Sequence, residues 1–348
     1  MDAEQADRIA VDWDAFDAAG GKQIVEEHAA RYQHKKGKEQ KEQISQNPVI
    51  RQNSLDQYVT AGSSQPRRVR RPNAPLTDVV VTASDGTVIG WDATGVGWPL
   101  LLVHGGVGDG DGAAWRFVRP LLPDGLRAVA MDRRGRGRSD RGDDASHSLE
   151  VEADDVLAVA EALGGGVVVA AHSIGATITL QALRRAGDLI AGAVLYEPPL
   201  PGMPSGLGSS DAMLTALDEG RAEDALVAFL RDMVQLAPGD IEAYRASPAW
   251  SSRVALIWTV RRENASLRAL DPDLGRYGGI RIPVELVVGD RTAGHAREAV
   301  DALAAVLPDV GVTVLEGQGH GALAQAPQLV ADAIAALLAR LPAVATDS

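Results

Sequence analysis

The chain has 348 residues, no cysteine and a formal net charge of −13. Its hydrophobic content of 45% is enough for a sizeable core, and the lack of cysteine excludes disulfides and thiolate metal sites. The charge is uneven, because residues 1–72 carry 12 basic and 11 acidic side chains whereas residues 73–348 carry 22 and 36. A domain this acidic repels polyanions at long range, so we expect no nucleic-acid partner.

The first 73 residues differ in composition from the rest of the chain. Residues 35–43 are almost entirely polar, and residues 62–72 combine glycine, serine, proline and a cluster of arginines. Such segments cannot bury enough apolar surface to offset their ordering entropy, so we expect residues 1–73 to form a flexible extension. We find neither a signal-peptide pattern nor an apolar run of about 18 residues, and we therefore expect a cytoplasmic protein without a membrane partner. The oligomeric state cannot be predicted.

Strand and helix patterns alternate from residue 76 onward. Two short β-branched runs at 79–81 and 87–89 flank an Asp-Gly pair and predict an antiparallel hairpin. The run at 100–103 is continuously apolar, which is typical of a parallel strand buried on both faces. The other predicted strands are 128–131, 167–171, 191–196, 284–288 and 312–315. Helical patterns follow them at 113–122, 149–163, the segment after residue 173, 297–307 and 328–341. This alternation predicts an α/β fold with a mostly parallel sheet flanked by helices.

The alternation is interrupted between about residues 200 and 278. That stretch contains only helical patterns, at 212–217, 223–236, 241–246 and 253–262. We therefore predict a helical insertion between the sixth and seventh strands. The predicted organisation is an extension (1–73), a first part of the core (74–199), the insertion (200–278) and a second part of the core (279–348).

A serine stands where a predicted strand turns directly into a helix. The apolar run that starts at Val167 ends just before Ser173, and a helical pattern begins immediately after it. Ala171 and Gly175, two residues on either side, are small enough for the two backbones to approach closely. This is the pattern of a nucleophile elbow, Gly-x-Ser-x-Gly, with alanine at its first position. The alternative is a serine that merely caps the helix.

A serine nucleophile needs a base, and the base needs an acid that orients it. Asp290 and His320 each follow a predicted strand, so both belong to the same edge of the sheet as Ser173. Their chain order is serine, aspartate, histidine, as expected for this architecture. We predict Ser173, Asp290 and His320 as a catalytic triad. Glu197, which follows strand 191–196, and His295 are the alternative acid and base.

Acyl transfer also requires donors for a developing oxyanion. They are expected from the main chain just after the nucleophile and from the loop after strand 100–103. The N–H groups of Ile174 and Gly106 are our candidates. Neither a metal nor an organic cofactor is required by this arrangement.

Residues 76–342 resemble α/β-hydrolase-fold enzymes of the esterase, lactonase and cofactor-free haloperoxidase type. The resemblance is carried by His104-Gly105-Gly106, Asp132-x-Arg134-Gly135-x-Gly137-x-Ser139, Ala171-His172-Ser173-Ile174-Gly175, Gly289-Asp290 and Gly319-His320. It implies Ser173 as nucleophile, Asp290 as acid and His320 as base, with the oxyanion hole at Gly106 and Ile174. It also implies that the insertion is a cap over the substrate pocket.

The sequence therefore predicts a serine hydrolase that cleaves an ester, thioester or lactone of a small acyl substrate. One alternative keeps the fold but not the hydrolysis, as in a lyase, a cofactor-free cyclase or a haloperoxidase-like enzyme. The other is a dinucleotide-binding oxidoreductase, because Gly108-x-Gly110-x-x-Ala113 follows a strand and Asp132 ends the next one.

Overall fold

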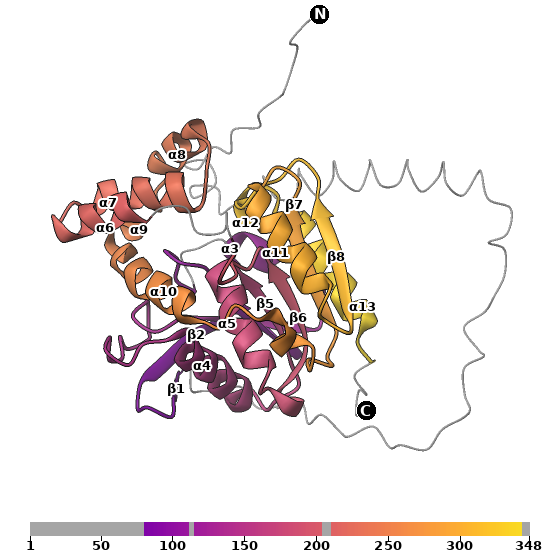
Figure 1. Ribbon diagram of the computed structural model, residues 1–348. Helices are drawn as coiled ribbons and strands as arrows, with labels where there is room; N and C mark the ends of the chain where they lie inside the picture. The colour runs from indigo at the N-terminus through magenta and orange to yellow at the C-terminus, as the bar shows by residue number, and fades with distance from the viewer. Residues whose placement is uncertain (1–79, 111–114, 204–209, 343–348) are drawn as a thin grey trace, which may run out of the picture. The chain divides into compact units, whose positions relative to one another are not determined.

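The computed structural model describes residues 80–110, 115–203 and 210–342, and its centre is an eight-stranded sheet (Figure 1). The predicted extension at 1–73 lies outside these residues. The strand order is β1-β2-β4-β3-β5-β6-β7-β8. The β1–β2 and β2–β4 pairs are antiparallel, and the other pairs are parallel. The strands are β1 (Val80–Thr82), β2 (Val88–Gly95), β3 (Trp98–Val103), β4 (Leu126–Met131), β5 (Val167–His172), β6 (Ile190–Tyr196), β7 (Val284–Gly289) and β8 (Val310–Leu315).

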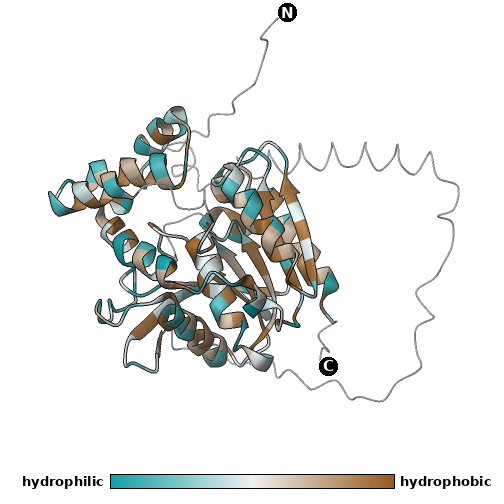
Figure 2. Ribbon diagram, viewed as in Figure 1, coloured by the Kyte–Doolittle hydropathy of each residue, from teal (hydrophilic) through white to brown (hydrophobic). Residues whose placement is uncertain are grey.

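Helices pack on both faces of this sheet. One face is covered by α4 (Leu149–Ala162), α5 (Ile174–Leu183) and α11 (Gly294–Ala304). The other is covered by α3 (Trp115–Val118), α12 (Ala322–Gln325) and α13 (Pro327–Arg340). In β3, Leu101 faces the first layer and Leu102 the second, and both are fully buried. Burial on both sides explains why the central strands are continuous apolar runs, coloured brown in Figure 2.

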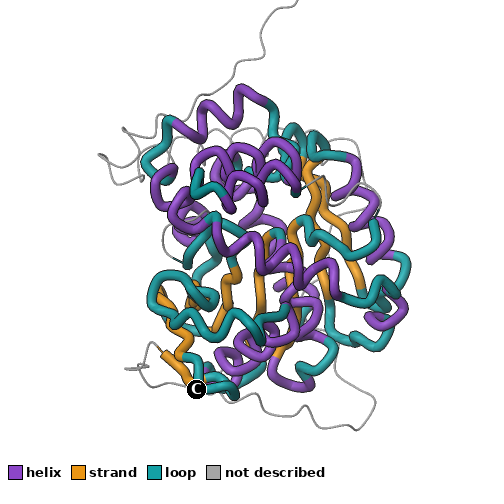
Figure 3. The backbone as a smooth tube through the Cα atoms, turned by 60° about the vertical axis from the view of Figure 1, so that its left-hand side comes forward, coloured by secondary structure: helices purple, strands orange, loops and turns teal. Residues whose placement is uncertain are grey.

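In the described part of the segment between β6 and β7, the regular elements are helices and helical turns. Its helices pack around an apolar cluster of their own that includes Met213, Leu226, Leu230, Ile241 and Ile257. Figure 3 shows helices and loops, without strands, in this part of the described chain. The elements are α6 (Asp211–Asp218), α7 (Ala222–Ala228), a π-helical turn (Phe229–Met233), α8 (Pro238–Arg245), α9 (Trp250–Leu256), α10 (Trp258–Ala269) and a 3₁₀ turn (Leu274–Tyr277).

The strands and the hairpin agree with the predictions, but several helices differ in extent. Of the helix predicted at 113–122, residues 113–114 lie outside the described structure, and the described part is α3 followed by a 3₁₀ turn at Arg119–Leu121. Pro120 lacks a main-chain N–H, which prevents α3 from continuing. The helix predicted at 223–236 divides into α7 and the π-helical turn. In the part of the chain that is described, no helix is both long and apolar enough to cross a membrane.

A glycine at the start of α5 allows the helix to pack against the end of β3. A Cβ at Gly175 would lie 2.4 Å from the carbonyl oxygen of His104 and 3.0 Å from that of Val103. Gly175→Ala should therefore lower the free energy of unfolding by about 1–3 kcal/mol, measured by urea denaturation.

The matched control is Gly239→Ala in α8, where an added Cβ would have no neighbour within 4 Å. We expect this variant to be at least as stable as the native protein, because alanine favours helix. Equal stability of Gly175→Ala and the native protein would contradict the packing argument.

Candidate active site

Ser173 lies at the turn between β5 and α5, as the sequence predicts. Its backbone adopts φ 55° and ψ −131°, a conformation that is strained for any residue with a side chain. The turn is held by the Ser173 N–H, which donates to the carbonyl oxygen of Tyr196 over 2.8 Å. Ala171, which replaces the usual glycine, is fully buried in β5 and is accommodated there. The half-buried serine thus stands on a sharp, fixed turn at the carboxyl edge of the sheet.

His320 lies beyond β8 and contacts a carboxylate from β6. Its Nδ1 is 2.5 Å from Oε2 of Glu197, which directly follows β6 and has a φ of 48°. Oε1 of Glu197 accepts hydrogen bonds from the Gly289 N–H at 2.9 Å and from the Thr292 hydroxyl at 2.5 Å. Both oxygens of this buried carboxylate are therefore used, and its orientation toward the imidazole is fixed.

The prediction that Asp290 makes this contact is wrong. Asp290 does follow β7, but its side chain is exposed, and among the described residues it forms no hydrogen bond with His320. β6 lies next to β7 in the sheet, so Glu197 and Asp290 reach the same edge. It is the buried carboxylate of Glu197, just after β6, that contacts Nδ1 of His320. Glu197, the alternative acid of the sequence, is thus the residue that pairs with His320.

The remaining predicted site residues come together. Gly106, Ser173, Ile174 and His320 all line one cavity. In the described structure no hydrogen bond joins the side chains of Ser173 and His320, a common situation before substrate is bound. With Nδ1 engaged by Glu197, Nε2 is the ring nitrogen left for the serine.

His295, the alternative base, lines the same cavity but is placed differently. Its Nδ1 is buried and has no hydrogen-bond partner among the described residues. Burial, together with the nearby His320, lowers the pKa of His295 below its ordinary value. Among the described residues, His295 has no hydrogen bond to a carboxylate, whereas His320 is oriented by Glu197.

The loop that carries His320 is anchored on both sides. The Tyr196 hydroxyl donates to the carbonyl oxygen of Gly319, and Nε2 of His172 donates to that of His320 over 3.1 Å. Burial holds the pKa of His172 well below its ordinary value, with a further contribution from His320. His172 is therefore a neutral anchor next to the serine rather than a base.

The loop after β3 is fixed by hydrogen bonds to its carbonyl groups. Nε2 of the buried His104 accepts the Arg133 N–H at 3.1 Å, so the ring proton is on Nδ1, which donates to the Gly105 oxygen at 2.8 Å. Nη1 of Arg133 donates to the same oxygen at 3.1 Å. In a planar trans peptide the N–H of Gly106 points opposite to the Gly105 carbonyl. These bonds therefore set the direction of the Gly106 N–H.

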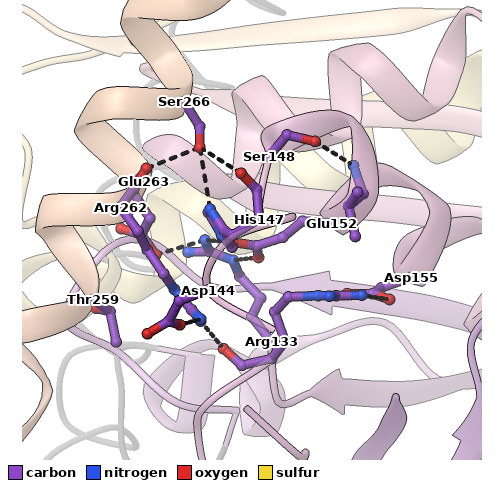
Figure 4. Close-up of polar contacts among 12 residues, drawn as sticks. Arg133, Asp144, His147, Ser148, Glu152, Asp155, Thr259, Arg262, Glu263 and Ser266 are labelled. Atoms are coloured by element: carbon purple, nitrogen blue, oxygen red, sulfur yellow. Dashed lines mark hydrogen bonds and ion pairs between the residues drawn. The ribbon is translucent and has the colours of Figure 1, made fainter. Parts of the chain in front are cut away.

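A cluster of buried charges supports this loop, and the sequence did not reveal it (Figure 4). Arg133 forms ion pairs with Glu152 of α4 and Glu263 of α10, both at 2.7 Å. Arg136 also pairs with Glu263 and donates to the Gly106 oxygen at 2.8 Å. Charges buried this deeply require partners, and breaking such a pair is strongly destabilising. The cluster joins the loop to α4 and α10 at once.

Asp132 has a structural role in the same region. Its buried carboxylate accepts the Gly110 N–H at 2.7 Å and the Arg138 N–H at 2.9 Å. The acidic residue that the dinucleotide-binding alternative requires is therefore already used to join two loops.

The sheet order, the serine turn and the imidazole–carboxylate pair are those of the α/β-hydrolase fold. A sequence model of the alpha/beta hydrolase family matches residues 100–333, and the chain belongs to this family. Solved structures agree on the fold. An alpha/beta hydrolase from Sphaerobacter thermophilus aligns with a TM-score of 0.65 and 28% identity, over 74% of this chain and 99% of that chain. An esterase from Rhodococcus sp. ECU1013 aligns with a TM-score of 0.61 and 23% identity, over 76% and 100%.

Curated relatives are similar over shorter stretches. A non-heme chloroperoxidase of Streptomyces lividans is 36% identical over 150 residues, which is 41% of this chain and 52% of that protein. A 2-hydroxymuconate semialdehyde hydrolase of Pseudomonas sp. (strain CF600) is 36% identical over 90 residues, 22% of this chain and 32% of that protein. The chain thus spans about a third to a half of the first curated relatives. A 2-(acetamidomethylene)succinate hydrolase of Mesorhizobium japonicum is 24% identical over 68% of this chain and 86% of that protein.

The buried histidines make stability depend on pH. Burial keeps the pKa of His104 and His172 well below the ordinary 6.5, so below that pH the unfolded chain binds protons that the folded one does not. Acidification from pH 6.5 to 5 should therefore lower the free energy of unfolding, by at most about 1.4 kcal/mol per pH unit for each histidine. Urea denaturation at several pH values tests this.

His172→Gln retains a donor for the His320 carbonyl but cannot titrate. Its free energy of unfolding should fall less steeply between pH 6.5 and 5 than that of the native protein. Identical slopes for the native protein, His172→Gln and His104→Gln would show that these histidines do not cause the dependence.

Proposed function

We propose that the chain is a serine hydrolase that cleaves a carboxylic ester, thioester or lactone through an acyl-enzyme. Ser173 is the nucleophile, His320 the base and Glu197 the acid. The observation that carries this proposal is the Glu197–His320 contact at the rim of a cavity that also holds a serine on a strained turn. Serine, imidazole and carboxylate in these roles are the parts that acyl transfer requires.

The proton path follows from the hydrogen bonds of the carboxylate. Nε2 of His320 takes the hydroxyl proton as Ser173 attacks the carbonyl carbon, and then gives it to the leaving group. Glu197 keeps the imidazole in the tautomer with a proton on Nδ1 and stabilises the imidazolium that forms. Water then attacks the acyl-enzyme by the same relay in reverse. Because Gly289 and Thr292 hold the other carboxylate oxygen, Glu197 needs no rearrangement during either step.

The oxyanion of each tetrahedral intermediate binds to the N–H groups of Ile174 and Gly106. The former follows the nucleophile at the start of α5, and the latter is oriented by the hydrogen bonds on the Gly105 carbonyl. Donors held in place before the reaction stabilise the developing charge without reorganisation, and losing one typically costs about 2.7–4 kcal/mol.

The helical segment between β6 and β7 is the cap of this enzyme. Phe229, Met233, Val234, Val260 and Leu267 from this segment line the cavity with apolar surface. They exclude water from the acyl group and strengthen the hydrogen bonds at the reacting centre.

A second candidate activity uses the same acyl-enzyme. Relatives of this chain are named non-heme chloroperoxidase and bifunctional esterase/perhydrolase. We infer that hydrogen peroxide can replace water in the second step, releasing a peroxy acid.

Removal of the nucleophile is the first test. Ser173→Ala should abolish both the hydrolysis of short acyl esters and covalent labelling by a fluorophosphonate probe, measured by product release and by intact mass. Retention of either signal at the native level would contradict a serine mechanism. Equal circular dichroism spectra and melting temperatures of the two proteins serve as the folding control.

The second test distinguishes the two carboxylates. Glu197→Gln should lower kcat by about 10³–10⁴, because an amide cannot stabilise the imidazolium and favours the wrong tautomer. Asp290→Asn, at the exposed carboxylate beyond β7, should keep kcat within about twofold of the native value. Loss of activity in Asp290→Asn with retention in Glu197→Gln would reverse the assignment.

A further inference from the structure

One wall of the catalytic cavity carries two polar side chains that the proposed mechanism does not use. Glu263 and Asn264, adjacent in α10, line the cavity together with the apolar residues of the same helix. Both are almost completely buried, with 3% and 6% of their surface exposed. Most polar atoms this deeply buried have a hydrogen-bond partner in the protein or in ordered water, so an unpaired one among the residues of a cavity is available to a bound ligand.

Glu263 has one oxygen engaged by the protein and one toward the cavity. Oε1 accepts from Arg133 at 2.7 Å and from Arg136. Oε2 has no hydrogen-bond partner among the described residues, and it lies 3.5 Å from the position that a Cβ on Gly106 would take. A hydrogen-bond acceptor with negative charge therefore stands next to the loop that holds the proposed oxyanion donor.

Asn264 provides a second acceptor beside it. Its Oδ1 is buried and has no hydrogen-bond partner in the described part of the chain. Leaving such an atom unpaired is unfavourable, and a donor on a bound substrate would remove that cost. Glu263 and Asn264 are consecutive residues of this wall, and each has an oxygen that can accept a further hydrogen bond, which favours a group that donates hydrogen bonds.

The charges around the cavity disfavour an anion at this position. Of the described residues that line it, two are glutamates, Glu197 and Glu263, and none is an arginine or lysine. The two arginines behind Glu263 are balanced by Glu152 and by Glu263 itself. Because both arginines are already balanced, a substrate carboxylate against this wall would meet the free oxygen of Glu263 with no further cation to offset the repulsion, which is unfavourable.

We propose that the α10 wall is a specificity site that binds an uncharged hydrogen-bond donor, a hydroxyl or an amide N–H, close to the scissile carbonyl of the substrate. The preferred substrates are therefore neutral hydroxy- or amido-substituted esters, and esters with a carboxylate at this place are rejected. This inference rests on the proposed hydrolysis at Ser173. It goes further by naming the substrate class and the two residues that select it.

Matched esters test the wall directly. The acyl series consists of the phenyl esters of butyrate, 3-hydroxybutyrate, 3-methoxybutyrate and succinate (the anionic monoester). The leaving-group series consists of the 2-hydroxyethyl and 2-methoxyethyl esters of butyrate. In at least one series the hydroxy compound should exceed its methoxy partner about tenfold in kcat/KM. The succinate monoester should be at least tenfold slower than the butyrate ester.

Variants of the wall identify the residues responsible. Asn264→Leu, similar in shape but without an acceptor, should reduce the hydroxy-to-methoxy ratio at least fivefold. Glu263→Gln should reduce the disadvantage of the succinate monoester. Because Glu263→Gln weakens two buried ion pairs, its folding is checked by thermal unfolding, and Asn264→Leu tests the site independently. Arg268→Ala, at an exposed position of the same helix, is the control that should keep both ratios at the native values.

Equal kcat/KM for hydroxy and methoxy esters in both series, equal rates for the succinate and butyrate esters, or ratios unchanged in Asn264→Leu would overturn the proposal. If no ester is hydrolysed, the proposed function fails, and the wall is tested by binding instead. Calorimetry with Ser173→Ala then compares 3-hydroxybutyramide, 3-methoxybutyramide and succinamate. Tighter binding of the hydroxy compound supports the specificity site, and equal binding of all three overturns it.

Discussion

The site depends on the close contact between two loops at the carboxyl ends of β3 and β5. A Cβ at Gly175 would lie 2.4 Å from the His104 carbonyl oxygen, and a Cβ at Gly105 would lie 3.1 Å from the Cβ of Ser173. Because both carbons are absent, the strained serine turn rests directly against the loop after β3. Ser173, Ile174 and Gly106 consequently line one cavity, and a larger side chain at Gly105 or Gly175 would push the two loops apart.

The buried arginines extend this contact into the rest of the molecule. Arg133 and Arg136 follow β4, hold the carbonyl groups of the neighbouring loop, and pair with Glu152 in α4 and Glu263 in α10. An unpaired guanidinium at this depth would be far too costly, so all four charges must stay together. Helix α10 and the loop after β3 are therefore held together by these contacts. The same pairing turns one oxygen of Glu263 toward the protein and the other toward the cavity.

The strands, the elbow and the histidine could be predicted because each has a local cause. Continuous apolar runs indicate strands buried on both faces, and the small residues around Ser173 indicate a tight turn whatever the rest of the chain does. The acid could not be predicted in this way. Glu197 and Asp290 both follow strands that end at the same edge, and only the packing of β6 against β7 decides that Glu197 is buried against His320 while Asp290 is exposed.

The amino-acid sequence by itself determined the fold class, the position of the serine on the turn after β5 and the set of residues at the carboxyl edge of the sheet. The spacing of apolar residues and the size of neighbouring side chains determine structure over a few positions, so both can be read directly from the sequence. The three-dimensional structure decided which carboxylate orients the imidazole and which side chains line the cavity. Arg133 and Glu263 are 130 positions apart, and Glu197 and His320 are 123 apart. Contacts at such separations depend on how complete helices and strands pack, and no local pattern encodes them.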